Sequence, residues 1–366
     1  MCSKSANIKR IRFIDNAKSI GLILVVLGHS VLATNIVTLH QVIYSFHMPL
    51  FFFISGLLHK DFALSLGGIR LKASKLLLPF YFTALLYATV KCIIDLDHFM
   101  GYEWKPFIHG VLWGTGGRGS VDRYLFWPPL WFFTSLFVTQ VGYVLMRKHL
   151  LAYLSMCWRV VVVTIILCFG IYLLVTAGKQ YLIIGNMRII VADNGFFYNL
   201  DLLPVTLFYY WLGVELQFIK KKTSTKNDQY LVLIIFWLAI FLFATLSICR
   251  AYEVGGEQHW AVMDLNYRNY GNIVVSTIMA ISGIVIVLNV SKYLNIKTMD
   301  ILAKFASYGV VIIAFHYVFQ HNASSILGHS TLGAVIGIVL GIVGPVILAE
   351  LVIKRIPLLA SIYNIS

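Results

Sequence analysis

Residues 18–37 of the chain read KSIGLILVVLGHSVLATNIV, an apolar run with one lysine at its start. A transmembrane helix needs about 20 consecutive, predominantly apolar residues, so this run predicts a membrane span. It is too long for a cleavable signal peptide and lacks a small-residue cleavage site. We therefore expect it to remain in the protein as a signal anchor.

Similar apolar runs follow along the whole 366-residue chain. With the first run, the predicted spans are 18–37, 42–59, 76–94, 128–146, 158–178, 200–218, 229–249, 270–290, 304–323 and 332–353. They predict an all-α fold, a polytopic transmembrane helical bundle with about ten spans. No repeat or low-complexity tract divides the chain, so residues 1–366 are expected to form a single transmembrane domain.

The basic residues indicate how the bundle is oriented. If the N-terminus is cytoplasmic, 21 of the 29 Lys and Arg residues fall in predicted inner segments and eight in outer ones. Short cytoplasmic loops carry an excess of basic residues in membrane proteins. The bias holds across successive loops, which predicts an even number of spans and cytoplasmic N- and C-termini.

Composition argues against several other protein classes. The chain is 59% hydrophobic and 12% charged, against about 25% charged residues in soluble domains. The net charge of +14 lies in short loops, not on one face with interleaved aromatic residues. It therefore predicts contact with lipid head groups and no nucleic-acid binding. The five cysteines have no metal-ligand spacing, and no metal site is expected.

The longest predicted segment outside the membrane runs from 95 to 127, on the outer side. It contains a glycine-rich stretch, residues 114–119. We expect a flexible loop here. Contact with a polar substrate and a plain surface role both remain open.

Polar side chains within the apolar runs are candidate site residues, because burying them in a membrane is costly unless they are paired. On a helix, His29 and Lys18 are about 20° apart and separated by roughly 16 Å along the axis, and Asp15 lies about 40° to the other side. These three residues would line one polar seam. A neutral histidine can take a proton from a hydroxyl group, although a hydrogen-bonded structural histidine is the alternative.

Three further candidates lie along the chain. His47 opens the second predicted span, where Pro49 suits the first turn of a helix, and a structural or substrate-contacting role is favoured. Lys72 and Lys75 share one helix face, and could hold phosphates or be ordinary positive-inside residues. His316 lies near other polar residues in the ninth span and suggests a polar lining.

Several of these stretches resemble one protein family. IDNAKSIG at residues 14–21, followed by VVLGH at 25–29, resembles the first helix of the acyltransferase-3 family, bacterial membrane O-acyltransferases that modify cell-surface sugars. FHMPLFFFISG at 46–56 resembles the family's signature at its second helix, and LWFF at 130–133 is a looser match. Lysines replace the usual arginine at position 18 and the arginine pair at 72 and 75. Lysine keeps the positive charge of arginine, but it cannot make the paired hydrogen bonds that a guanidinium group makes to a phosphate.

The resemblance implies a membrane O-acyltransferase of the bacterial cytoplasmic (inner) membrane, with acetyl as the expected acyl group. Acetyl-CoA or another acyl-CoA would be the donor. A sugar hydroxyl of a cell-surface polysaccharide or lipid-linked glycan would be the acceptor. Membrane lipids are the other expected partners, and homo-oligomer formation remains open.

The resemblance also implies roles for individual residues. His29 would be the general base or a transient acyl carrier, with Asp15 assigned to the catalytic group but expected to pair with Lys18. The residues expected to bind the CoA phosphates are Lys18, Arg12, Lys72 and Lys75. The residues expected to contact the acceptor are His47, Trp131 and His316. A polytopic transporter of a glycan or small molecule is the alternative, although the sequence contains no convincing inverted repeat.

Overall fold

The computed structural model consists mainly of α-helices. It describes residues 12–365 apart from 31, 34–35, 95, 99, 102–103, 115–129, 178–180, 185–186, 191–195, 221–225, 254–262, 267, 295–298 and 328–329. The helices are α1 (Arg12–Gly28), α3 (Val37–Tyr44), α4 (His47–Leu57), α5 (Leu66–Ile94), α6 (Leu96–His98), α7 (Trp104–Trp113), α8 (Trp131–His149), α9 (Met156–Ala177), α10 (Leu203–Lys220), α11 (Lys226–Glu253), α12 (Ile273–Tyr293), α13 (Met299–Ser307), α14 (Gly309–Ile326), α15 (Thr331–Leu351) and α16 (Pro357–Ile362). Short 3₁₀ helices are η3 (Leu151–Tyr153), η4 (Phe197–Asn199) and η5 (Ile353–Arg355).

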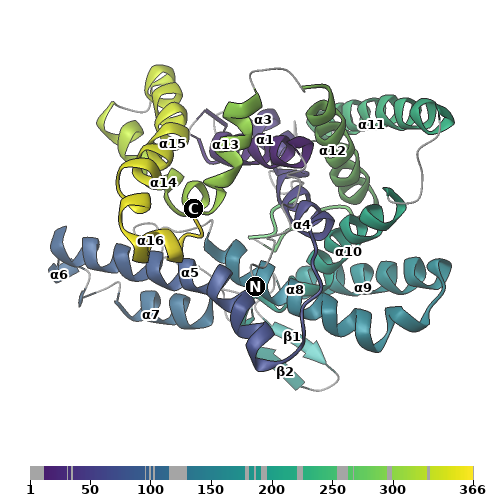
Figure 1. Ribbon diagram of the computed structural model, residues 1–366, viewed down its shortest axis with the longest axis horizontal. Helices are drawn as coiled ribbons and strands as arrows, with labels where there is room; N and C mark the ends of the chain where they lie inside the picture. The colour runs from purple at the N-terminus through teal and green to yellow at the C-terminus, as the bar shows by residue number, and fades with distance from the viewer. Residues whose placement is uncertain are drawn as a thin grey trace, which may run out of the picture.

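Helix α1 joins the two ends of the chain. It packs against α3 and α4, which follow it directly, and against α12, α13, α14 and α15 from the C-terminal half. In Figure 1, α14 and α15 lie at the upper left, α11 and α12 at the upper right, and α5, α8 and α9 along the lower part. Helix α1 therefore brings groups from both halves of the sequence together.

Four of the described helices are long and apolar enough to cross a membrane. They are α5, residues Met156–Leu174 of α9, α12, and the segment Thr331–Arg355 that contains α15 and η5. Residues Ile234–Ser247 of α11 form a shorter apolar helix. The expectation of about ten spans, with both termini cytoplasmic, remains a prediction.

Three predicted spans are not single helices. The run 18–37 breaks after Gly28, because the Ser30 hydroxyl donates to the Leu27 carbonyl at 2.6 Å and accepts the Ala33 amide at 3.1 Å. A side chain that bonds to nearby backbone in this way competes with the helix. The run 42–59 is divided between α3 and α4, and 304–323 is divided at Tyr308.

Two regions outside the predicted spans also differ from expectation. Helix α7 lies within the segment 95–127, which was expected to be a loop, and ends at Gly114 with a φ of +72°. Residues 115–129, with most of the glycine-rich stretch, lie outside the described residues. Strands β1 (Tyr181–Ile184) and β2 (Met187–Ile190) pair antiparallel, an exception to the all-α class.

Glycines allow two helix pairs to approach closely. A Cβ atom at Gly56 of α4 would collide with the Tyr210 carbonyl of α10, and one at Gly213 of α10 with the Phe53 carbonyl of α4. In α15, Gly344 faces the Phe319 ring of α14. Small residues at such positions are typical of contacts between membrane helices.

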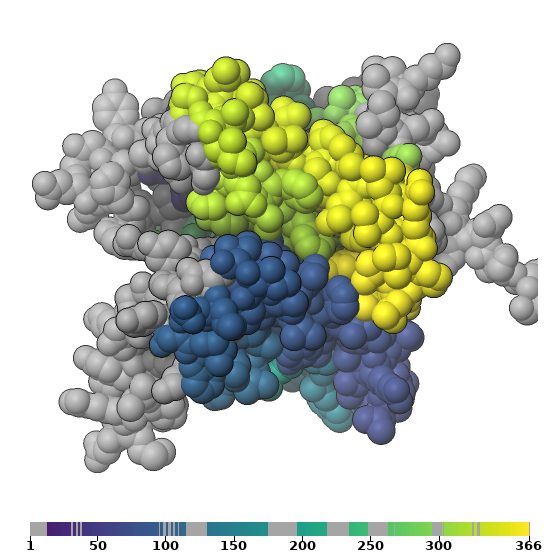
Figure 2. Space-filling model, turned by 90° about the vertical axis from the view of Figure 1, so that its left-hand side faces the viewer, coloured from purple at the N-terminus to yellow at the C-terminus, as the bar shows by residue number. Residues whose placement is uncertain are grey.

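The last described residues pack against α5. The Thr83 and Tyr363 hydroxyls are 2.9 Å apart, and Asn364 Nδ2 donates to the Lys75 carbonyl at 3.2 Å. Figure 2 shows this C-terminal segment in yellow directly above the blue of α5. The helix that carries Lys72 and Lys75 is thus fixed by residues almost 300 positions later.

Candidate functional site

His29 lies at the point where α1 ends. Its backbone amide still donates to the Val25 carbonyl at 3.1 Å, and its partly exposed ring leaves the helix beside groups from α3 and α14. The Tyr44 hydroxyl is 3.3 Å from His29 Nδ1. The ring centroids of His316 and Tyr317 are 5.4 and 6.3 Å from that of His29. The break after Gly28 therefore places an imidazole among aromatic and basic rings.

Tyr44 is held between two further histidines. Its ring stacks on His40 with centroids 3.9 Å apart and meets the His47 ring edge-on at 4.7 Å. Buried His47 donates from Nδ1 to the Ile43 carbonyl at 3.0 Å. His47, predicted to contact the acceptor, thus supports the tyrosine beside His29 in this structure.

His316 is fully buried in α14. Its Nδ1 donates to the Ile312 carbonyl at 2.8 Å, which leaves the lone pair on Nε2. Among the described residues, His316 Nε2 has no hydrogen-bond partner. Gln320, one turn later, donates to the Val26 carbonyl of α1 at 3.0 Å and fixes the two helices together. Although four histidines lie in this region, the described residues contain no group suited to hold a metal ion.

The remaining predicted residues of the first seam lie far from His29. Asp15 is buried in the first turn of α1, where a negative charge suits the helix dipole. Fourteen residues of helix separate it from His29, or about 21 Å. Lys18 is partly buried one turn later, and Arg12 begins the helix, although its side chain is not described. The structure places these residues at the opposite end of α1 from the histidines.

Lys72 and Lys75 lie in the first turns of α5. The Lys72 ammonium is 4.9 Å from the centroid of the Phe62 ring, and Lys75 is exposed. Helix α4 runs back along α1, because Gly28 faces Tyr44 while Gly21 faces Phe51. The segment 58–65 then leads from the end of α4 into α5. Among the described residues, they lie beside Phe62 and Asn364, and not beside the histidines around Tyr44.

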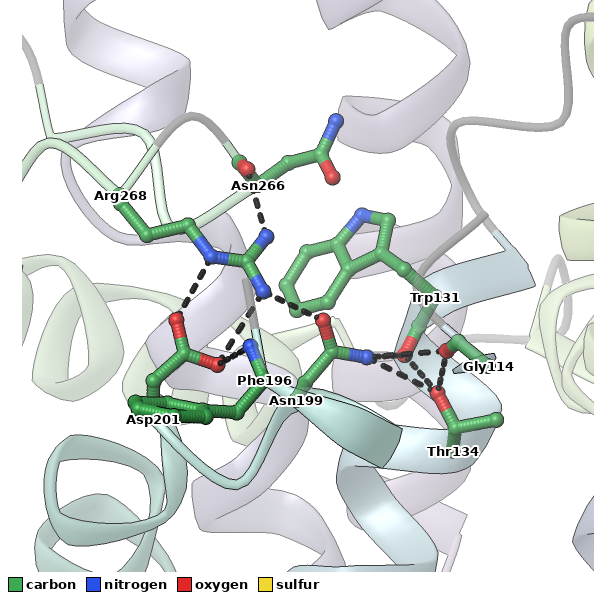
Figure 3. A network of polar contacts seen from close by, with 8 residues as sticks. All are labelled: Gly114, Trp131, Thr134, Phe196, Asn199, Asp201, Asn266 and Arg268. Carbon is green, nitrogen blue, oxygen red and sulfur yellow. Dashed lines mark hydrogen bonds and ion pairs between the residues drawn. The ribbon is translucent and has the colours of Figure 1, made fainter. Parts of the chain in front are cut away.

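A buried ionic network lies at the start of α8, α10 and α12. Arg268 Nε donates to Asp201 Oδ2 at 2.8 Å, Nη2 to Asn199 Oδ1 at 2.7 Å, and Nη1 to the Asn266 carbonyl at 2.9 Å. Figure 3 shows the guanidinium group between these acceptors. The Arg268 side chain is 3% exposed and that of Asp201 0%. Such a pair is tolerated because hydrogen bonds satisfy both charges.

The network continues through Asn199 to Trp131. Asn199 Nδ2 donates to the Gly114 carbonyl at 3.1 Å, the Trp131 carbonyl at 3.3 Å and the Thr134 hydroxyl at 2.9 Å. Figure 3 shows all these groups on one side of Asn199. Trp131, predicted to contact the acceptor, is 4% exposed, and its backbone belongs to this network.

A second series of hydrogen bonds lies just after the end of α4. Buried His59 accepts the Tyr210 hydroxyl at Nδ1 (2.7 Å) and donates from Nε2 to Asp61 at 3.1 Å. Arg147 also donates to Asp61, at 2.5 Å. Burial opposes ionisation of Asp61, but the bond from His59 and the Arg147 charge lower its pKa overall. These hydrogen bonds connect the end of α4 to α8 and α10.

Sequence reasoning did not single out Tyr44, His59 or Arg268 as functional candidates. Arg268 carried a signal, because a basic residue on the predicted outer side opposes the positive-inside bias. Tyr44 and His59 carried none, because their partners are determined by packing between separate helices. The polar seam of α1 predicted His29 as a site residue, but it did not predict the groups that surround His29.

Comparison of the sequence with models of protein families identifies the family of this chain. A model of the acyltransferase-3 family, described as an acyltransferase domain, matches residues 11–350. No curated protein and no solved structure matches the chain. The match covers nearly the whole sequence, and four described helices are suited to a membrane. The chain therefore belongs to the acyltransferase-3 family and is a membrane acyltransferase.

Proposed function

We propose that the protein transfers an acetyl group from acetyl-CoA to a sugar hydroxyl of a cell-surface polysaccharide or lipid-linked glycan. The observation that carries the proposal is the position of His29 at the end of α1, with Tyr44 at Nδ1 and His316 beside it. Family membership favours acyl transfer over the transporter alternative. The location is the bacterial inner membrane.

The proposed chemistry uses the two nitrogens of His29 differently. In the active tautomer, Nδ1–H donates to the Tyr44 oxygen, and the lone pair on Nε2 faces the acceptor hydroxyl. Nε2 takes the hydroxyl proton as the acceptor oxygen bonds to the thioester carbonyl carbon. The carbon–sulfur bond then breaks, and the imidazolium returns its proton to the CoA thiolate. The products are a sugar ester and free CoA.

The other predicted residues divide between donor and acceptor. Arg12, Lys18, Lys72 and Lys75 would attract the CoA phosphates at the end of the bundle where α1 begins. In this proposal the acyl end runs along α1 toward His29. His316 Nε2, a buried acceptor, is suited to receive a hydrogen bond from the substrate. His47 and Trp131 act by supporting their neighbours.

The test compares His29→Ala with His149→Ala in purified protein in nanodiscs. His149 is exposed at the end of α8 and is the matched control. Acetyl-CoA is supplied without acceptor, and the slow release of free thiol is followed. We expect hydrolysis to be lost in His29→Ala by about 10²-fold or more and retained in the control. Equal rates in both variants, at equal thermal stability, would contradict the role of His29.

A further inference from the structure

Glu350 in the last turn of α15 accepts bonds from three parts of the chain. Lys304 Nζ of α13 is 3.2 Å from one carboxylate oxygen, and Lys354 Nζ of η5 is 3.3 Å from the other. The buried Tyr308 hydroxyl donates to Glu350 as well. The Lys354 ammonium also lies 5.2 Å from the Tyr308 ring centroid. Two cations and one hydroxyl thus converge on a single anion.

Apart from these donors, the position of Glu350 is unfavourable for a negative charge. The C-terminal end of a helix carries a partial negative charge, which disfavours a carboxylate and favours lysine. The side chains of Glu350 and Lys354 are about one third exposed, at 33% and 32%, and that of Lys304 is 66% exposed. Ion pairs with this exposure contribute little free energy. The two lysines are therefore available to another anion, and the buried Tyr308 hydroxyl could be reached only by an anion that takes the place of the Glu350 carboxylate.

This cluster adjoins α1 near Ser19, in the middle of that helix. Helix α13 packs on α1, and the Ser19 hydroxyl donates to the Leu302 carbonyl, two residues before Lys304. Ser19 follows Lys18 directly. From Ser19 to His29, α1 rises by about 15 Å. A ligand anchored at the cluster could therefore extend along α1 to the histidines.

We propose that Lys304, Lys354 and Tyr308 form a phosphate-binding site, which the Glu350 carboxylate fills until a ligand arrives. A phosphate group offers oxygens that accept charge-assisted hydrogen bonds, and it would take the donors while the Glu350 side chain turns to water. The phosphate belongs either to the acyl-CoA donor or to a lipid head group. Assignment to the donor rests on the proposed function; the site itself does not.

The experiment measures the affinity of CoA for purified protein in neutral phosphatidylcholine nanodiscs, without turnover. The variants are Lys304→Gln with Lys354→Gln, and Glu350→Gln alone. Glu215→Gln and Lys148→Gln are controls. Glu215 is a carboxylate already paired with Arg159 and Trp211, and Lys148 is exposed on α8. A second arm measures retention of phosphatidylglycerol by the same variants.

The phosphate site predicts opposite effects of the two changes. Glu350→Gln removes a competing anion and should tighten binding by about fivefold. The double lysine variant should weaken it by roughly tenfold or more. Opposite effects on CoA assign the phosphate to the donor, and opposite effects on phosphatidylglycerol alone assign it to lipid.

A purely structural network gives a different result. In that case both changes lower thermal stability together and neither changes affinity in the folded protein, which would overturn the proposal. The His29→Ala protein separates this result from the catalytic role. The lysine and glutamate effects on binding should persist there, although acetyl transfer is lost.

Discussion

The hydroxyl group of Tyr44 is expected to orient the His29 ring. It is 3.3 Å from His29 Nδ1, while the Tyr44 ring stacks on His40. Tyr44→Phe removes the hydrogen bond and keeps the ring. A neutral hydrogen bond contributes about 1 kcal/mol, so we expect a fall in kcat of about fivefold with little change in KM for acetyl-CoA. Steady-state kinetics would test this. An unchanged kcat would show that Tyr44 does not orient His29.

Asp61 gives a pH-dependent prediction. Its pKa is lowered in the folded protein, so its stabilising effect is present above the unfolded pKa and is lost as pH falls through the folded value. The unfolded value is about 3.9. Asp61→Asn should lower the Tm by a small amount at pH 7, and the difference from wild type should shrink below pH 4. Thermal unfolding in detergent across this range measures it, and a difference that grows in acid would contradict the pairing.

At the scale of elements, the approach of α4 to α10 depends on two glycines. Because a Cβ at Gly213 would collide with the Phe53 backbone, Gly213→Ala must separate the helices. Overpacking of this kind costs about 1–3 kcal/mol. We expect a lower Tm and less folded protein after extraction. Gly67→Ala is the control, because its added Cβ would meet nothing within 4 Å beyond its chain neighbours and its own turn of helix, and it should leave the Tm nearly unchanged.

The Arg268 network predicts coupling between elements. Arg268→Met leaves Asp201 buried without its charge partner, so we expect a loss of about 3–5 kcal/mol. Adding Asp201→Asn should restore part of that loss, because the unpaired charge is then gone. Arg159→Met, which breaks a more exposed pair, should cost far less. Thermal unfolding of the single and double variants measures the coupling, and additive losses would argue against it.

For the whole molecule, the charge distribution predicts that both termini lie on the cytoplasmic side. Reporter proteins fused to each terminus, one active only in the cytoplasm and one only outside it, would measure this. We expect both termini to give the cytoplasmic signal, as an even number of spans requires. Opposite signals would show that one predicted run does not cross the membrane.

The apolar runs predicted the positions of most long helices because burial in lipid demands continuous apolar sequence. The runs 76–94, 158–178 and 270–290 each fall on one helix. The break after Gly28 was not predictable in this way, because it depends on bonds made by the Ser30 hydroxyl. The same distinction between what the apolar runs predict and what packing decides applies to the site. His29 was found from its place in an apolar run, whereas Tyr44 becomes its neighbour only through the turn that the break creates.

That break also has an electrical consequence. The last carbonyl groups of a helix carry a partial negative charge, equivalent to about half an electron. His29 follows Gly28 directly and therefore lies in the field of this terminus. An imidazolium formed there would be stabilised by about 0.3–1 kcal/mol, and by up to about 2 kcal/mol where water is excluded. Helix α1 would then lower the energy of the charged intermediate by the direction in which its own peptide bonds point.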